Sequence, residues 1–361
     1  MGAAAANTVI DAKYSSWAIN INYEENVTVE GFTIKNSNAG IAANYSSFLT
    51  IKNNVIEKNE FGGISIGINS FSNKIENNIV KNNKSSGIFF FENSSVDTIK
   101  NNIINKNENY GIFIAENSTA EDISGNIITK NGIDGIQIYG SSLANSIRNN
   151  FVSENMIEGI TVAANSIADD ISENTVVKNQ LDGIRVYYSS SVKNINNNTI
   201  EGNAFEGIAL YSDATTESIS GNTVTENGED GIQISYSSSG NIMNNEISNN
   251  ARVGILISTD SASENISGNT ISENALSGIV VQNNSSADIN KNFIRGNIYD
   301  GIFIAGNSTA SIGLTGGKLK IISNGDDGID IEPDSTATIN VQNIFFKGNK
   351  DKEIEGKYQN P

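Results

Sequence analysis

One stretch decides the fold: Asn102-Ile103-Ile104-Asn105-Lys106-Asn107-Glu108-Asn109-Tyr110-Gly111-Ile112-Phe113-Ile114. Its pattern, Asn-x-hydrophobic-x-x-Asn-x-x-x-Gly-Ile-x-hydrophobic, returns along most of the 361-residue chain. The Gly-Ile pair begins at Gly40, Gly63, Gly87, Gly111, Gly135, Gly159, Gly183, Gly207, Gly231, Gly254, Gly278, Gly301 and Gly328. Successive copies are 23 or 24 residues apart, except for a last step of 27. A fixed period of this size is typical of a stack of identical supersecondary units.

The residue types within each repeat indicate strands. Two short runs alternate between β-branched and polar residues, as in Asp122-Ile123-Ser124 with Ile127-Ile128, and then in Gly135-Ile136-Gln137-Ile138. Asn, Ser and Gly separate the runs, which is the composition of turns. No run has the length and the 3.6-residue periodicity of a helix. Each repeat is therefore expected to be a coil of short strands.

Two asparagine positions recur in almost every repeat. The first series is Asn54, Asn78, Asn102, Asn126, Asn150, Asn174, Asn198, Asn222, Asn245, Asn269 and Asn292, and the second is Asn59, Asn83, Asn107, Asn131, Asn155, Asn179, Asn203, Asn227, Asn250, Asn274 and Asn297. Asparagine tolerates the left-handed conformation, and its amide can bond to an equivalent amide one coil away. We expect each series to form a ladder at a bend.

These features predict an all-β fold, a single-domain right-handed parallel β-helix, or solenoid, of about 13 coils with 24-residue repeats and asparagine ladders. Residues 1–48 are expected to form the opening coils, residues 49–310 the regular repeats, and residues 311–361 irregular C-terminal coils with a charged tail. The tail contains the charged run from Lys347 to Glu353. We interpret this run as protection of an exposed strand edge against pairing with another chain.

The composition excludes several classes of function. The formal net charge is -18, from Lys+Arg 23 and Asp+Glu 41, and the basic residues are scattered, whereas nucleic-acid binding needs a basic patch. There is no cysteine, which excludes disulfides and thiol chemistry, and no histidine. No stretch has the length of a membrane span. The opening Met1-Gly2-Ala3-Ala4-Ala5-Ala6 lacks the basic and long apolar regions of a signal peptide, so any signal or anchor would lie outside this sequence.

Three kinds of segment carry a resemblance to a known family: Thr8-Val9-Ile10-Asp11, then Asn26-Val27-Thr28-Val29-Glu30-Gly31-Phe32-Thr33-Ile34, and repeats such as Ile99-Lys100-Asn101-Asn102-Ile103-Ile104 and Gly111-Ile112-Phe113-Ile114. On these segments the chain resembles the right-handed parallel β-helix repeat family, in particular its NosD-like, carbohydrate-binding and sugar-hydrolase branch, which includes pectate-lyase-like enzymes. The resemblance covers nearly the whole chain. It implies the fold, and it implies no single activity, because the family contains enzymes, tailspikes and surface proteins.

An acidic row precedes the repeat glycine. The residue before this glycine is Asp134, Glu158, Asp182, Glu206 and Asp230 in five consecutive coils, with Asp300 and Asp327 later. Unpaired carboxylates cannot be buried cheaply, so we expect this row to line a solvated outer corner. Neighbouring charges about 4.8 Å apart repel by roughly 1 kcal/mol even in water, which a cation or a hydroxyl-rich ligand would relieve.

A second candidate feature is the set of outward residues in the Gly-Ile strand. In five consecutive coils they are Gln137, Thr161, Arg185, Ala209 and Gln233, followed two residues later by Tyr139, Ala163, Tyr187, Tyr211 and Ser235. Phe89, Phe91 and Phe113 extend the aromatic stripe. Rings can pack on sugar faces and polar groups can bond to hydroxyls. With the acidic row, these positions define the candidate ligand-binding residues: Asp134, Gln137, Tyr139, Glu158, Asp182, Arg185, Tyr187, Glu206, Tyr211, Asp230 and Gln233.

The candidate catalytic residues are Arg185, Asp182 and Glu206. Glycosidase chemistry needs two facing carboxylates and a lyase needs a base with cationic assistance, which this cluster contains. The stretch from Asn324 to Glu332 superficially resembles the aspartate motifs of polygalacturonases. The histidine and the arginine-lysine motif of that family are absent, and so is the histidine that the resemblance implies for epimerases.

The candidate metal ligands form an acidic cluster near the C-terminus: Asp326, Asp327, Asp330, Glu332 and Asp334. Carboxylate oxygens suit calcium. Copper is disfavoured, because the chain has no histidine or cysteine and only 3 methionines. We expect no cofactor to be required, with calcium as the ion that this cluster could bind.

Three functions stay open. The sequence favours an extracellular or cell-surface β-helix that presents a carbohydrate-binding or adhesive face to a polysaccharide or cell-surface glycan without catalysis. The first alternative is a polysaccharide lyase or glycoside hydrolase that acts on the acidic and aromatic face. The second is a structural rod or fibre subunit. The sequence sets no oligomeric state.

Overall fold

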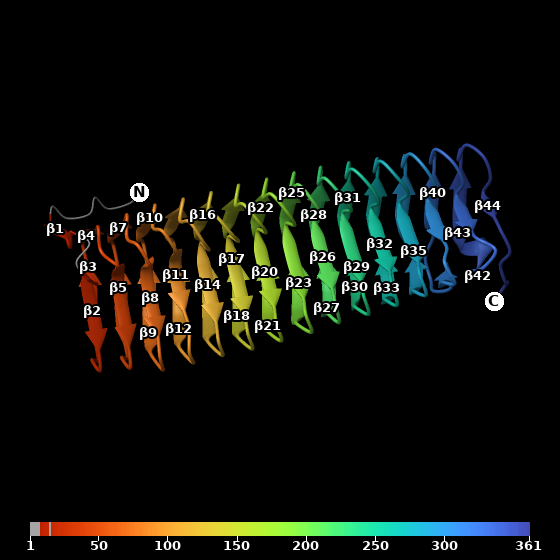
Figure 1. Ribbon diagram of the computed structural model, residues 1–361. Coiled ribbons are helices and arrows are strands. Elements are labelled where there is room, and N and C mark those ends of the chain that lie inside the picture. The colour runs from red at the N-terminus through yellow and green to blue at the C-terminus, as the bar shows by residue number, and fades with distance from the viewer. Residues whose placement is uncertain (1–7, 14–15) are drawn as a thin grey trace. The chain divides into compact units, whose positions relative to one another are not determined.

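The computed structural model describes residues 8–13 and 16–361, so the opening residues Met1 to Ala6 lie outside the described part. The chain divides into two compact units, Met1–Gln180 and Leu181–Pro361, called unit 1 and unit 2 below. In each unit every coil adds one short strand to each of three parallel sheets (Figure 1). Among the described residues, no helix has the length and hydrophobicity needed to cross a membrane.

Unit 1 contributes the following strands. Its first sheet contains β1 (Thr8–Asp11), β4 (Phe32–Lys35), β7 (Val55–Glu57), β10 (Ile79–Lys81), β13 (Ile103–Asn105), β16 (Ile127–Thr129), β19 (Phe151–Ser153) and β22 (Thr175–Val177). Its second sheet contains β2 (Ile19–Asn22), β5 (Ala39–Asn44), β8 (Gly62–Gly67), β11 (Ser86–Phe90), β14 (Ile112–Ala115), β17 (Ile136–Tyr139) and β20 (Ile160–Ala163). Its third sheet contains β3 (Thr28–Glu30), β6 (Leu49–Lys52), β9 (Phe71–Glu76), β12 (Ser95–Lys100), β15 (Thr119–Ser124), β18 (Leu143–Arg148) and β21 (Ile167–Ser172).

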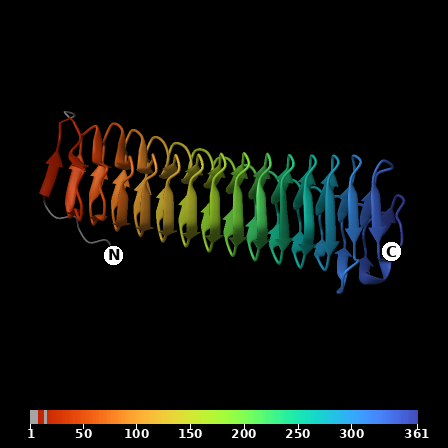
Figure 2. The same ribbon diagram turned by 90° about the horizontal axis from the view of Figure 1, so that it is seen from below.

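Unit 2 repeats this arrangement, and within it successive coils again lie side by side (Figure 2). Its first sheet contains β25 (Thr199–Glu201), β28 (Thr223–Thr225), β31 (Glu246–Ser248), β34 (Thr270–Ser272), β37 (Phe293–Arg295), β40 (Leu319–Ile322) and β43 (Ile344–Lys347). Its second sheet contains β23 (Ile184–Tyr187), β26 (Ile208–Tyr211), β29 (Ile232–Ser235), β32 (Ile255–Ser258), β35 (Ile279–Gln282), β38 (Ile302–Ile304), β41 (Ile329–Ile331) and β44 (Ile354–Glu355). Its third sheet contains β24 (Ser191–Asn196), β27 (Thr215–Ser220), β30 (Ser239–Met243), β33 (Ala262–Ser267), β36 (Ser286–Asn290), β39 (Thr309–Ile312) and β42 (Thr336–Ile339), and a short 3-10 helix, η1, spans Val341–Asn343.

The core consists of stacks of aliphatic side chains, which arise because each repeat places aliphatic residues at the same positions. Parallel pairing places equivalent residues of neighbouring coils side by side, as for Val80 and Ile104 in β10 and β13. Both of these side chains are fully buried. Because the side chains of a strand alternate between its two faces, one or two aliphatic residues per strand suffice to fill the narrow interior. This explains how a chain that is only 37% hydrophobic folds into a solenoid.

The predicted asparagine ladders are present. Asn102 Nδ2 donates to Ile75 O at 2.8 Å and to Asn126 Oδ1 at 3.0 Å, and Asn102 Oδ1 accepts from Asn78 N at 2.9 Å. One detail differs from the prediction, because the left-handed residue is the one before the ladder asparagine, for example Asn101 with a φ of 55°. The ladder asparagine uses its buried amide instead of an unusual backbone angle.

A third ladder, made of serine, occupies the remaining corner and was not predicted. Ser94 N donates to Ser118 Oγ at 3.2 Å, and Ser118 N donates to Ser142 Oγ at 3.1 Å. Two left-handed residues precede each such serine, for example Glu116 and Asn117. Each corner of the coil is therefore fixed by a side chain that bonds to the next coil.

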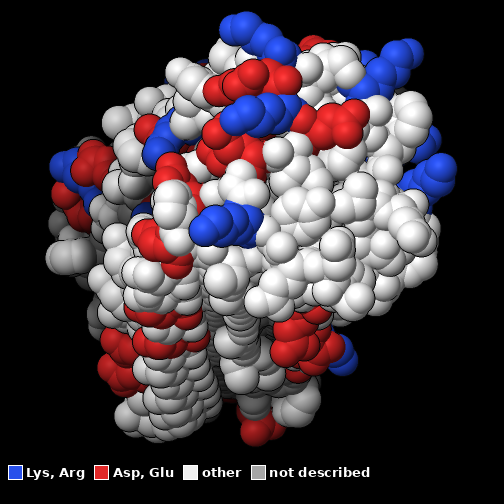
Figure 3. Space-filling view, turned by 90° about the vertical axis from the view of Figure 1, so that its right-hand side faces the viewer, with Lys and Arg blue, Asp and Glu red and all other residues white. Residues whose placement is uncertain are grey.

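The all-β, parallel β-helix prediction with asparagine ladders is confirmed, whereas the single-domain organisation and its three segments stay predictions. Lys and Arg side chains lie among Asp and Glu at the C-terminal end of unit 2 (Figure 3). There Lys352 Nζ lies 2.8 Å from Glu355 Oε1 on the terminal strand β44. Charged groups at this edge fit the expected role of the tail.

The repeat glycine allows a test of the coil spacing. A Cβ atom built on Gly207 would lie 2.6 Å from Gly231 O of the next coil, so Gly207→Ala forces neighbouring coils apart and should destabilise unit 2 by about 3 kcal/mol. Gly316→Ala is the matched control, because a Cβ there meets nothing within 4 Å. Thermal unfolding followed by circular dichroism measures both variants. Equal melting temperatures would contradict the packing described here.

Candidate functional site

The outer face of the second sheet in unit 2 carries the predicted polar and aromatic residues. Arg185 pairs with Ala209 and Tyr187 with Tyr211 across β23 and β26, and Ala209 pairs with Gln233 across β26 and β29. The expected register is therefore correct. Ala209 has only a methyl group, which leaves room between its larger neighbours in this row. The outward residues, which vary between coils, therefore determine the chemistry of this face, while the residues that repeat in every coil determine the positions of its strands.

The acidic row is buried, which contradicts the predicted solvated corner. Asp134, Asp182 and Asp230 are 1%, 2% and 0% exposed. The reason is a hydrogen bond that the repeat pattern does not reveal, because each carboxylate accepts from a backbone N–H of the next coil. The N–H groups of Glu158, Glu206 and Val253 donate to Asp134 Oδ1, Asp182 Oδ1 and Asp230 Oδ1 at 3.2, 3.1 and 2.9 Å. Bonds of this kind offset part of the cost of burying a carboxylate.

In unit 1 the predicted residues Asp134, Gln137, Tyr139 and Glu158 form a local cluster. Gln137 Nε2 donates to Asp134 Oδ2 at 3.0 Å, and Tyr139 remains exposed. Burial, followed by the charge of Glu158, raises the pKa of Asp134 well above its usual range. Burial also raises the pKa of Tyr110, and the Asp134 carboxylate adds to that effect. Burial in this cluster therefore favours the protonated, neutral forms of Asp134 and Tyr110.

Aromatic rings stack beside this cluster in unit 1. The Phe89 and Phe113 centroids are 5.1 Å apart with nearly parallel planes, and Phe89 stacks on Phe91 at 4.8 Å. Tyr110 stacks on Phe113 at 4.3 Å. The predicted aromatic stripe is therefore real within unit 1. Offset stacked pairs of this kind stabilise the sheet by about 1 kcal/mol each beyond their burial, so they have a structural role of their own.

Unit 2 contains a hollow of about 390 Å³ at the polar part of this face. It is lined by Leu181, Asp182, Arg185, Phe205, Glu206, Tyr211, Glu229 and Arg252, and is called the Arg185 hollow below. Arg185 Nη1 lies 3.7 Å from Asp182 Oδ2. The Arg185 guanidinium carbon lies 4.8 Å from the centre of the Tyr187 ring and 5.2 Å from that of Tyr211. The carboxylate and the two rings therefore hold the guanidinium in one place.

Tyr211 supplies a hydroxyl to the Arg185 hollow. Its oxygen lies 3.0 Å from Glu206 Oε1 and 2.5 Å from Gln233 Oε1. A tyrosine hydroxyl has one proton, so it can fully serve only one of these two acceptors at a time. Burial, followed by the charges of Glu206 and Asp182, raises the pKa of Tyr211, so the hydroxyl keeps its proton at neutral pH.

The rim of the Arg185 hollow was missed by sequence reasoning. Arg252 Nη1 lies 2.8 Å from Glu229 Oε2, and Leu181 and Phe205 add apolar walls. All four residues occupy one repeat position, two residues before the repeat glycine. Comparing that position across repeats would have found them, because it changes from leucine to phenylalanine, glutamate and arginine in consecutive coils.

The predicted residues of unit 2 are thus only partly brought together. Asp182, Arg185, Glu206 and Tyr211 line the Arg185 hollow, while Tyr187 and Gln233 support it through the contacts given above. Asp230 lies fully buried, and among the described residues its Oδ2 atom has no hydrogen-bond partner. Burial raises the pKa of Asp230 to about 6, against the lowering effects of the Val253 N–H and the Arg252 charge.

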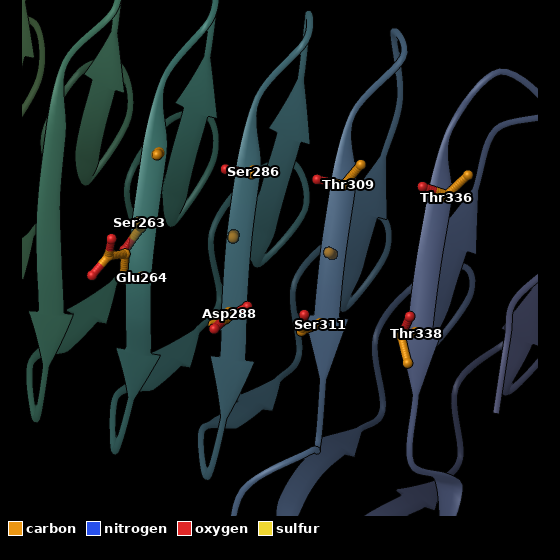
Figure 4. Close-up of a pocket in the computed structure, with 11 residues that line it drawn as sticks. Ser263, Glu264, Ser286, Asp288, Thr309, Ser311, Thr336 and Thr338 are labelled. Carbon is orange, nitrogen blue, oxygen red and sulfur yellow. The ribbon is translucent and has the colours of Figure 1, made fainter. Parts of the chain in front are cut away.

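A second hollow of about 310 Å³ lies on the third sheet of unit 2, over β33, β36, β39 and β42 (Figure 4). Two rows of small polar side chains line it. One row contains Ser286, Thr309 and Thr336, and the other contains Asp288, Ser311 and Thr338. Its lining includes no aromatic or basic side chain. Since it offers hydroxyls and carboxylates without a stacking surface, the Arg185 hollow is the stronger candidate.

Three of the five predicted metal ligands, Asp326, Asp327 and Asp330, belong to two overlapping acidic groups that also contain Asp300 and Asp351. Possible donor atoms of Asp300, Asp327 and Asp330 lie within 4.8 Å of one another, as do those of Asp326, Asp327 and Asp351. Glu332 and Asp334 belong to neither group. Burial, followed by the neighbouring Glu355, raises the pKa of Asp327 to about 6. Calcium binding here stays a prediction.

The sequence matches the family described as a right-handed β-helix region, over residues 17–169 and 158–319. The chain belongs to this family. A comparison with curated proteins finds no match. The NosD-like branch within the family stays a prediction.

Among solved structures, the chain resembles the A-module of the Azotobacter vinelandii mannuronan C-5 epimerase AlgE4, with a TM-score of 0.51 and 14% identity over 89% of this chain and 90% of that one. The A-module of AlgE6 from the same organism gives a TM-score of 0.45 and 13% identity over 95% and 89% of the two chains. A variant of the periplasmic alginate epimerase AlgG gives a TM-score of 0.45 and 14% identity over 92% and 77%. At 14% identity the likeness to the AlgE4 module shows the fold alone.

The buried Asp230 gives a pH-dependent prediction. The pKa of Asp230 is raised from 3.8 to about 6 in the folded state, so the folded protein holds this proton more tightly than the unfolded chain. The stabilisation from the protonated carboxyl is therefore fully present below pH 3.8 and is lost as the pH rises through 6, which lowers the free energy of unfolding by about 3 kcal/mol. Asp230→Asn keeps an oxygen for the Val253 N–H and removes the charge. The variant should therefore melt higher than the wild type at pH 7.5, and this difference should shrink toward pH 4. The exposed Asp213→Asn is the control, and a gain that is the same at both pH values would contradict the assignment.

The acidic groups near the C-terminus allow a separate test. Calcium at 10 mM should raise the melting temperature by about 3 °C, because bound cations relieve the repulsion between these carboxylates. Asp327→Asn should abolish the increase, since Asp327 belongs to both groups. Asp334→Asn, which lies outside them, should retain it. If calcium leaves the melting temperature of the wild type unchanged, the prediction of a calcium site is wrong.

Proposed function

We propose that the Arg185 hollow in unit 2 binds a neutral, hydroxyl-rich polysaccharide. The observation that carries the proposal is the Arg185 guanidinium, fixed over the Tyr187 and Tyr211 rings beside the Asp182 and Glu206 carboxylates. Sugar hydroxyls need donors and acceptors in fixed positions, and sugar rings pack against aromatic side chains. The hollow combines both kinds of group on a rigid sheet.

The charges of the Arg185 hollow favour a neutral ligand over a polyuronate. Its two cations are each beside a carboxylate, since Arg185 lies near Asp182 and Arg252 pairs with Glu229. Glu206 adds a further acidic group. An anionic polymer would have to compete with these carboxylates for the guanidinium groups and would also meet a net charge of -18 on the chain. We therefore expect the ligand to differ from the mannuronan and the alginate named for the similar structures.

A polysaccharide ligand also supports a location outside the cytoplasm, at the cell surface or beyond it, where such polymers are exposed. The solved structures similar in fold include a protein described as periplasmic. We propose this location on the nature of the ligand and not on that likeness. The oligomeric state forms no part of the proposal.

Cleavage of the bound polysaccharide is the second candidate function. The observation that favours it is the Tyr211 hydroxyl 3.0 Å from Glu206 Oε1, which places a proton donor beside a carboxylate in the hollow. General acid–base catalysis needs such a pair within hydrogen-bond reach of the bond that reacts. A hydrolase would release new reducing ends, and a lyase would form an unsaturated product. If the wild type cleaves a polysaccharide and Glu206→Gln does not, the protein is an enzyme and the proposal of binding without catalysis is wrong.

Arg185→Ala tests the binding proposal. Removal of the guanidinium should weaken binding of a neutral polysaccharide at least tenfold, about 1.4 kcal/mol, because both the stacking and the hydrogen-bond donors are lost. Arg148→Ala is the matched control, since Arg148 pairs with Asp122 on the third sheet of unit 1 and is not among the residues that line the hollow. Titration calorimetry against glucan, galactan, mannan and polygalacturonate measures the affinities. Equal loss in both variants, or preference for polygalacturonate, would contradict the proposal.

A further inference from the structure

The outer face of the second sheet in unit 2 changes from polar to apolar at β32. Leu256 in β32 pairs with Val280 in β35, and Val280 pairs with Phe303 in β38. The same outward row holds Arg185, Ala209 and Gln233 in the preceding coils of this unit. The fold does not require apolar residues here, because the aliphatic core lies on the opposite side of the sheet. Three consecutive outward hydrophobic residues therefore need a separate explanation.

These residues form a cluster outside the coil. Leu256 and Val280 are only 5% and 6% exposed, because Val253, Leu276 and Phe303 pack around them. A hollow of about 330 Å³ opens over this cluster, called the Leu256 hollow below. Its size is at the lower end of the range of small-molecule sites, which are about 300 to 1,000 Å³. It can thus accept a compact apolar group and not a whole sugar chain.

The two hollows share a wall. Arg252 lines both the Arg185 hollow and the Leu256 hollow, and its guanidinium is held by Glu229 at 2.8 Å. The far side of the Leu256 hollow carries polar groups, including Asp300 and the half-exposed Tyr299. A ligand that fills the polar hollow can therefore extend past Arg252 into an apolar site that is closed by polar groups beyond it.

We propose that the ligand of this face is a glycan with an apolar substituent, an alkyl or aryl group, which occupies the Leu256 hollow while the sugar occupies the Arg185 hollow. This inference rests on the proposed function and deepens it by naming the class of glycan. The driving force is the transfer of the apolar group from water to Leu256, Val280, Leu276 and Phe303. Arg252 marks the junction between the sugar and its substituent.

The test compares methyl, octyl and phenyl glycosides of glucose, galactose and mannose, below the micelle concentration of the octyl compounds. Calorimetry should show that the octyl or phenyl glycoside of one sugar binds at least tenfold more tightly than its methyl glycoside. Leu256→Gln should remove this difference. The substitution is conservative for the fold, because Gln233 already occupies the equivalent outward position in β29. Val280→Thr is a second variant, since Thr161 holds the same position of the repeat in unit 1.

Arg185→Ala separates the two proposals. It should weaken the methyl and octyl glycosides alike and leave the ratio between them unchanged. If the methyl and octyl glycosides bind equally well, the apolar site is wrong and the sugar site stands. If no glycoside of the three sugars binds while a neutral polysaccharide does, the inference fails and the proposed function stands. If the polysaccharides do not bind either, both proposals fail. Circular dichroism of each variant checks that the fold is kept. If the folded variants Leu256→Gln and Val280→Thr both still bind the octyl or phenyl glycoside more tightly than the methyl glycoside, by the same factor as the wild type, the inference is overturned.

Discussion

The structure of each unit depends on side chains that bond from one coil to the next at every corner. A ladder asparagine such as Asn102 accepts from the coil before it and donates to both neighbouring coils. Because a buried amide without partners is costly, these positions tolerate little change. The serine ladder acts in the same way at the third corner. The residues of the outer faces and of the turn before the repeat glycine differ more freely between coils, and the candidate site is built from them.

The repeat made most of the fold predictable from the sequence. The period, the alternation within strands and the two asparagine series predicted parallel sheets, the register and the ladders, all of which are present. The repeat glycine is explained by the close approach of the next coil, where a methyl group on Gly207 would meet Gly231 O. The serine ladder was missed because serine is also common in turns that make no ladder, so its repetition was not given weight.

The candidate site was less predictable, for a physical reason. Alternation along a strand gives the direction of a side chain and does not show what covers it. Asp134 and Asp230 were placed in solvent because an unpaired carboxylate is costly to bury, whereas backbone N–H groups of the next coil hold them in buried positions. Arg252 and Phe205 were overlooked because they belong to a turn, where the period-two argument does not apply. Their position two residues before the repeat glycine was nevertheless visible in the sequence.

The outer face of the second sheet in unit 2 combines three kinds of environment within a few coils. Arg185 and its carboxylate and tyrosine neighbours offer a polar hollow, Arg252 forms a shared wall, and Leu256 with Val280 forms an apolar hollow. The paired charges of the polar hollow leave little attraction for a polyanion. A neutral glycan that carries an apolar group fits this order of environments.

A crystal structure of the chain with a neutral oligosaccharide bound tests the central claim most directly. The account predicts sugar density in the Arg185 hollow, with one ring against Tyr211 and hydroxyls within hydrogen-bond distance of Arg185 and Glu206. Density confined to the hydroxyl-lined hollow over β33, β36, β39 and β42, with the Arg185 hollow left empty at saturating ligand, would contradict it.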